Sequence, residues 1–319
     1  MKRIPAMILA LLTAAALLVG CGTSERKIQA EPNTSYNADR YPYVLRTESA
    51  TWYLAKDDIE MMGEDAFFEN LYALIDDAEA DFKDAREALK GYIPDEIPPV
   101  DILTDFCNRT PISAIAAAYY NENVNFIKLF YGWDAARATL THEYVHYLTV
   151  HCAENPIQYA FWGEGVADYV AIFVCENRLA RSVNMMLTPE DVEQAKEKGA
   201  WDAKKDCVDL ERLYRGCGAV FASGEAVGVS YFAVCGETIE RSEAFADEPN
   251  TDQLSFYEAA GMIGYLVETY GKDAVFSNWN IKPTPSRMKE TFGKTFEELY
   301  RDWAVWNAEQ CKMLGIDVP

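Results

Sequence analysis

The three histidines of this 319-residue chain, His142, His146 and His151, all lie within one ten-residue stretch. The first two belong to the pentapeptide His-Glu-Tyr-Val-His, in which Glu143 follows the first histidine. On a helix, residues four apart lie on the same face, so their two imidazoles can reach one metal ion. Glu143 is then placed to accept a proton from a metal-bound water. The spacing predicts a hydrolytic metal centre, and zinc favours such ligands.

Two histidines do not complete a zinc site, so a third protein ligand is needed. His151 lies five residues beyond His146, which is about 140° farther round an α-helix, and we expect it to point away. The extended pattern HExxHxxGxxH requires glycine and a further histidine, but this chain has Thr149 and Cys152 at those positions. Cys152 remains a less favoured alternative ligand.

Two carboxylates offer a better third ligand downstream of His146. Residues 161–169 read Phe-Trp-Gly-Glu-Gly-Val-Ala-Asp-Tyr, with Glu164 and Asp168 four apart on one face of a second helix. Together with His-Glu-Tyr-Val-His, this run resembles the gluzincin metallopeptidases. It is most similar to their small bacterial, peptidase-MA-like members, whose second motif reads W-x-x-E-G-x-A-D/E-Y. The position of Trp162 differs slightly from this motif, because it stands two residues before the glutamate and the motif has three.

The resemblance implies a role for each of these residues. His142, His146 and Glu164 become the ligands of Zn²⁺. Glu143 becomes the general base, and Asp168 becomes the carboxylate that orients the His142 ring and raises its basicity. The implied reaction is hydrolysis of a peptide bond in a peptide or protein substrate.

Such a reaction needs a donor, besides the metal, for the developing oxyanion. Some gluzincins use a histidine for this donor and others use a tyrosine. Because no histidine of this chain lies outside 142–151, the resemblance implies a tyrosine in this role. Tyr257 is the first choice, since it opens a predicted helix in the back half of the chain that resembles the family. Tyr231 and Tyr159 are the alternatives.

The elements that must position these residues follow from hydrophobic periodicity. They are a strand at 50–54, a helix at 65–90 followed by Gly91, a strand at 100–103, hairpin strands at 114–120 and 124–131, and helices at 133–150 and 161–179. In the family, the last strand before the active helix is a sheet edge that pairs with extended substrate. The resemblance gives this role to 124–131, with 114–120 as the other option.

The back half is predicted to be mostly helical. A helix is expected at 256–270, and residues 295–298 (Thr-Phe-Glu-Glu) have the spacing of a capping box that opens another. Residues 181–252 are irregular and indicate an inserted subregion. The expected fold class is therefore α+β, and the resemblance specifies a zincin-like metallopeptidase fold. This fold has an N-terminal mixed sheet with helices, an active-site HExxH helix and a helical C-terminal half.

The N-terminus reads as an export signal. Lys2 and Arg3 precede an uncharged apolar run too short to be a typical membrane-spanning helix, which indicates a signal peptide at 1–20. The run ends Leu-Val-Gly-Cys, which resembles the bacterial lipobox and implies cleavage before Cys21 and its diacylation. We therefore expect a tether at 21–40, a peptidase domain at 41–319, and anchoring to the extracytoplasmic face of the cell membrane. The alternative is an ordinary secretory signal.

Composition limits the partners. The net charge is −22, and removing the two cations of the signal leaves 27 cations against 51 acids, or −24. Such a chain repels polyanions, so we expect no nucleic-acid partner, and we expect a monomer.

Of the seven cysteines that remain after Cys21, Cys207, Cys217 and Cys235 lie close enough in sequence for a disulfide to close a loop. The rival hypotheses are a non-catalytic binding lipoprotein of zincin fold and a structural or adhesion module.

Overall fold

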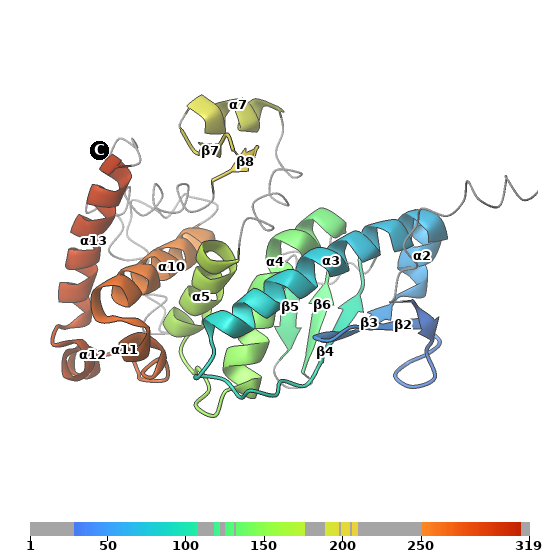
Figure 1. Ribbon diagram of the computed structural model, residues 1–319, viewed down its shortest axis with the longest axis horizontal. Helices are drawn as coiled ribbons and strands as arrows, with labels where there is room; N and C mark the ends of the chain where they lie inside the picture. Colours follow the sequence, from blue (N-terminus) through green and yellow to red (C-terminus); the bar gives the residue numbers. More distant parts are fainter. Residues whose placement is uncertain are drawn as a thin grey trace, which may run out of the picture.

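The computed structural model describes residues 29–107, 118–121, 125–130, 132–175, 189–197, 199–204, 206–209 and 251–313. The fold is α+β, with a mixed sheet in the N-terminal half and helices in the C-terminal half (Figure 1). In this described part of the chain, no helix is both long and apolar enough to cross a membrane.

The sheet has the order β1-β2-β3-β4-β6-β5. Its strands are β1 (Glu31–Pro32), β2 (Tyr43–Arg46), β3 (Ala50–Leu54), β4 (Val100–Thr104), β5 (Ala118–Asn121) and β6 (Phe126–Leu129). The β3–β4 and β4–β6 pairs are parallel, whereas the remaining neighbours are antiparallel. The predicted strand at 50–54 and the predicted hairpin are therefore present.

Two helices cover one face of this sheet. Alternate residues of β3 (Ala50, Trp52 and Leu54) are buried in the main core, as the period of two along a strand requires. The helix α3 (Glu64–Ala88) crosses this face and packs against α4 (Trp133–His146), where Phe82 stacks on Tyr144 with ring centroids 3.8 Å apart. A short helix, α2 (Lys56–Met62), leads into α3.

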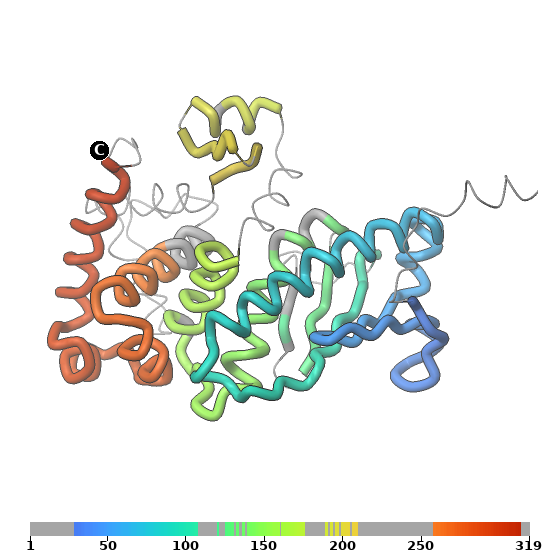
Figure 2. The backbone as a smooth tube through the Cα atoms, in the orientation of Figure 1, coloured from blue at the N-terminus to red at the C-terminus, as the bar shows by residue number. Residues whose placement is uncertain are grey.

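The second half of the molecule is built on α5 (Ala160–Asp168), which packs against α10 (Thr251–Tyr270). Three further helices follow: α11 (Lys272–Phe276), α12 (Pro285–Phe292) and α13 (Phe296–Met313). The capping box that opens α13 is present, because the Thr295 N–H donates to Glu298 at 2.7 Å and the Glu298 N–H donates to the Thr295 hydroxyl at 3.3 Å. In Figure 2, α11, α12 and α13 lie at the end of the molecule opposite β2.

The expected inserted subregion is described only in part. It contains α7 (Pro189–Glu197) and a two-stranded sheet of β7 (Trp201–Asp202) and β8 (Cys207–Val208). Residues 181–188 and 210–250, including Tyr231, Cys217 and Cys235, lie outside the described residues.

Two expectations about the N-terminal half are corrected. The assignment of 124–131 as the sheet edge is wrong, because β6 lies between β4 and β5, and among the described strands the edge is β5. The tether was expected to reach residue 40, but Glu31–Pro32 pairs with β2 and the buried Asn33 side chain donates to two backbone carbonyls. Packed structure therefore begins before residue 41. Cys21 lies outside the described residues.

Both predicted site helices change form near their ends. The α4 helix continues as a π-helix over Tyr147–Cys152, and α5 continues as a π-helix over Tyr169–Val174. Short π-helical stretches are rare and occur frequently at functional sites. Their wider turns alter which residues share a face beyond His146 and Asp168.

Candidate metal centre

The structure brings the three predicted metal ligands together. His142 and His146 project from successive turns of α4, and their Nε2 atoms lie 2.9 Å apart. A carboxylate oxygen of Glu164, from α5, lies 3.1 Å from the first Nε2 and 3.3 Å from the second. One ligand atom from each residue lies within 4.8 Å of the other two.

These separations fit a small tetrahedral cation. With zinc–ligand bonds of about 2.0–2.2 Å, neighbouring ligand atoms of a tetrahedron lie about 3.3–3.6 Å apart. The observed distances are close to this range, and the donors are the imidazole nitrogens and carboxylate oxygen that zinc accepts. The three side chains are also mostly shielded, with exposed fractions of 16, 13 and 28 % for His142, His146 and Glu164.

Asp168 holds the first imidazole. Its Oδ1 lies 2.6 Å from Nδ1 of His142, on the side of the ring away from the other ligands. A proton on Nδ1 leaves Nε2 as a lone-pair donor toward the centre, which is the arrangement that orients metal-bound histidines. Asp168 stands one turn after Glu164, so α5 supplies both a ligand and the partner of a second ligand.

The electrostatics of this cluster favour positive charge at its centre. Burial lowers the pKa of His142, but the adjacent Asp168 and Glu164 carboxylates outweigh it, and the pKa lies well above its ordinary value. Burial likewise raises the pKa of Glu164, whereas His146 and His142 lower it more strongly, and the net pKa falls far below the usual range. A cation at the centre would satisfy the same carboxylate.

Glu143 is held by a backbone donor of β5. The backbone N–H of Tyr120 in β5 donates to Glu143 Oε2 at 2.7 Å. The Tyr120 N–H therefore points away from β6 and toward α4. This contact was not anticipated from the sequence, because a backbone donor leaves no residue-type signal. The period of β5 could have indicated only which residues face outward.

The glycine after Glu164 has a packing role. A Cβ atom built on Gly165 would lie 2.9 Å from the Ile263 side chain and 3.1 Å from the Ala259 carbonyl oxygen, both in α10. At Gly163 the nearest atoms would lie at 3.7 and 3.9 Å, which is ordinary contact. Gly165 therefore permits α5 and α10 to approach closely.

His151 does not join the cluster. Its ring is exposed and stacks on Tyr147, with ring centroids 5.6 Å apart. The His151 side chain lies away from the cluster, as the sequence predicts. The angle of about 100° per residue behind that prediction does not apply, because residues 147–152 form a π-helix. Cys152 is likewise absent from the group of possible ligands found among the described residues.

The oxyanion donor is not identified by the described residues. Tyr257 belongs to α10, but its side chain lies outside the described part of the structure, as does the whole of Tyr231. Tyr159 is the N-cap residue of α5, and its carbonyl accepts a hydrogen bond from the Gly163 N–H at 2.9 Å. Its backbone thus helps to begin the helix that carries Glu164.

Comparisons with known proteins add no assignment to this geometry. No protein-family model matches the chain, and a search of curated proteins found no match. The residues and their arrangement therefore carry the functional assignment.

Proposed function

We propose that this chain is a zinc-dependent peptidase of zincin-like fold and gluzincin type. The observation that carries the proposal is the convergence of His142, His146 and Glu164, with Asp168 behind the first imidazole. Two independent sequence motifs, carried by two different helices, meet at a single point. A chance His-Glu-x-x-His helix would lack such a partner.

Each residue has a defined part in the proposed hydrolysis. Bound zinc would supply a Lewis acid and would lower the pKa of a water molecule toward neutrality. Glu143, held by the Tyr120 N–H, accepts the proton of the attacking water and delivers it to the leaving amine. Asp168 keeps the His142 ring in the tautomer that a ligand requires.

The edge strand supports a peptide as the substrate. Within an antiparallel strand, the N–H and C=O of one residue point to the same side. The Tyr120 backbone therefore faces the open edge of β5, next to Glu143. An extended peptide that adds to this edge would place its backbone beside the general base. For the oxyanion donor we retain Tyr257, with Tyr231 and Tyr159 as alternatives.

Metal analysis and a peptide screen test this proposal. Purified protein is expected to contain about one zinc ion per chain, and Glu164→Ala is expected to lose it. Glu154→Ala, which removes an exposed carboxylate between the two site helices, is the matched control and keeps the metal. Zinc retained at the wild-type level in Glu164→Ala would contradict the ligand assignment.

The peptidase activity itself is tested with Glu143→Gln. This variant is expected to keep zinc but to lose cleavage of a broad peptide library, with a chelator as the second control on the wild type. A wild-type protein that binds zinc and cleaves no peptide would instead support a non-catalytic binding lipoprotein.

We also propose that lipid on Cys21 attaches the protein to the extracytoplasmic face of the membrane. The support is the lipobox-like sequence before this cysteine. Metabolic labelling with a fatty acid is expected to label the wild type but not Cys21→Ser, and the variant is expected to leave the membrane fraction. Labelling of both proteins would contradict this assignment.

A further inference from the structure

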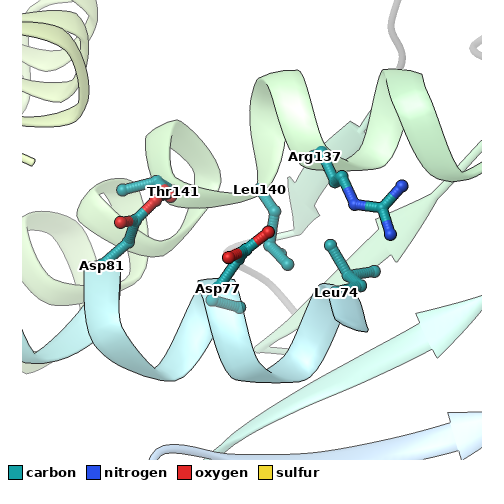
Figure 3. A pocket seen from close by; sticks show the side chains of 7 residues that line it. Leu74, Asp77, Asp81, Arg137, Leu140 and Thr141 are labelled. Carbon is teal, nitrogen blue, oxygen red and sulfur yellow. Dashed lines mark hydrogen bonds between the residues drawn. The ribbon is translucent and has the colours of Figure 1, made fainter. Parts of the chain in front are cut away.

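We propose that Asp81 is a positioning residue of the metal centre, an inference that rests on the zinc site proposed above. Asp81 belongs to α3 and only 4 % of it is exposed. Its Oδ2 accepts a hydrogen bond of 2.9 Å from the hydroxyl of Thr141, which is also buried (Figure 3). Thr141 directly precedes the ligand His142 in α4.

The same residue also contacts the second site helix. The Cys175 thiol donates to the backbone carbonyl oxygen of Asp81 at 3.5 Å. Cys175 ends the π-helix that continues α5 beyond Asp168. Asp81 thus bonds to α4 through its side chain and to the continuation of α5 through its backbone.

The two site helices are consequently joined at two places. On the metal side, the His142–Asp168 contact joins them directly. On the α3 side, Asp81 joins them through Thr141 and Cys175. Neighbouring residues of a helix are about 100° apart, so Thr141 and His142 face different elements. A bond on the Thr141 side therefore restrains rotation of α4 about its axis.

Small rotations matter at this site. A side-chain atom about 5–6 Å from a helix axis moves by about 1 Å when the helix rotates by about 10°. The Glu164 oxygen of α5 lies only 3.1 and 3.3 Å from the two histidine nitrogens of α4, so such a movement would disrupt their convergence. Functional groups generally need positions accurate to about 0.5 Å.

The Asp81–Thr141 bond lies at the edge of the packed α3–α4 interface, next to a small pocket. A cavity of about 10 Å³, with space for about one water molecule, lies beside the Asp81–Thr141 bond. Leu74, Leu140 and Arg137 line it farther along the two helices, as Figure 3 shows. The Asp81–Thr141 bond therefore adds a directional restraint to an interface that is also packed through the Phe82–Tyr144 stack.

Zinc affinity of matched threonine variants tests the proposal. Thr141→Val removes the hydroxyl while keeping the shape, and we expect zinc affinity to fall about 3–10-fold, less than the 10–100-fold typical of a direct ligand partner. Thr104→Val is the control, because this buried threonine bonds to the Ala55 N–H in the sheet. Its loss is expected to lower stability but to leave zinc affinity within about twofold.

Asp81 variants supply a second arm that separates bonding from charge. Asp81→Asn keeps an acceptor for Thr141 and should retain most of the affinity, whereas Asp81→Leu should lose at least as much as Thr141→Val. Combining Asp81→Leu with Thr141→Val should add little, because both remove the same bond. Unchanged zinc affinity in Thr141→Val and Asp81→Leu would overturn the proposal.

Hydrogen exchange distinguishes this proposal from the proposed function. If the wild type binds no zinc, the proposed function fails, and exchange of the α4 backbone amides decides the positioning role. Faster exchange at 142–146 in Thr141→Val than in Thr104→Val would support it. Equal exchange in the two variants would overturn it.

Discussion

The two helices that form the candidate metal centre are held in place by different means. The α4 helix is fixed by polar contacts on three sides: Thr141 to Asp81, His142 to Asp168, and Glu143 to the Tyr120 N–H. The contact of α5 with α10, in contrast, depends on a missing side chain at Gly165. Deletion of polar groups should therefore disturb α4, whereas added volume should disturb α5.

The largest effect is expected where the two helices meet. Asp168→Ala removes the partner of His142 Nδ1, and we expect zinc affinity to fall about 10–100-fold. Asp168→Asn keeps an acceptor at the same position and should lose less. Competition with a chromogenic chelator measures both. Equal affinity of Asp168→Ala and the wild type would show that α4 alone fixes the imidazole.

A volume change should distinguish α5 from α4. Gly165→Ala places a methyl group against Ile263 and the Ala259 carbonyl, so we expect a loss of about 1–3 kcal/mol in the free energy of unfolding. Gly163→Ala is the matched control on the same helix. It has ordinary space and should be neutral or stabilising by up to about 1 kcal/mol. Denaturant unfolding measures both, and equal stability of the two variants would refute close packing as the role of Gly165.

The pH dependence of zinc stabilisation should reflect both helices. The raised pKa of His142 gives a contribution to stability that is complete below about 6.5 and is lost as pH rises through the folded-state pKa. The lowered pKa of Glu164 gives a contribution present above about 4.5 and lost as pH falls through its folded-state pKa. Between about pH 4.5 and pH 6.5, the protonated His142 and the ionised Glu164 therefore stabilise the metal-free centre. In this range, protons compete with zinc for the ligand atoms. The rise in Tm caused by zinc should be larger at about pH 8 than at about pH 5.5, and the reverse order would contradict the charge arrangement.

The smallest effect is expected at the third histidine. His151→Ala removes an exposed ring that stacks on Tyr147, and zinc affinity should stay within about twofold of the wild type. A loss comparable to that of Asp168→Ala would mean that the π-helix brings this residue into the centre in solution.

The sequence predicted those features that depend on local spacing. The strand at 50–54, the helix beginning near residue 65 and the capping box at Thr295 follow from periodicity and from residue types with local roles. The approach of Glu164 to the histidines could also be expected, because a carboxylate was the best available third ligand.

The features that could not be predicted depend on tertiary context. Strand order decides whether β5 or β6 is the edge among the described strands, and both strands are four residues long. Glu31–Pro32 is too short to show a period, so its place in the sheet was missed. The π-helices were missed for a related reason, since a change from four- to five-residue hydrogen bonding leaves no reliable pattern in so few residues.

The bond from the Tyr120 N–H to Glu143 also bears on self-association. An outward-facing donor on an edge strand invites a strand from another molecule, and the carboxylate of Glu143 covers this donor within the described part of β5. Replacing Glu143 by alanine would leave that N–H without its acceptor, whereas glutamine retains an oxygen. The alanine variant would therefore expose an unpaired backbone donor that can pair with another molecule, whereas the glutamine variant would keep this donor covered. Light scattering of the two variants should show aggregation favoured in the alanine form.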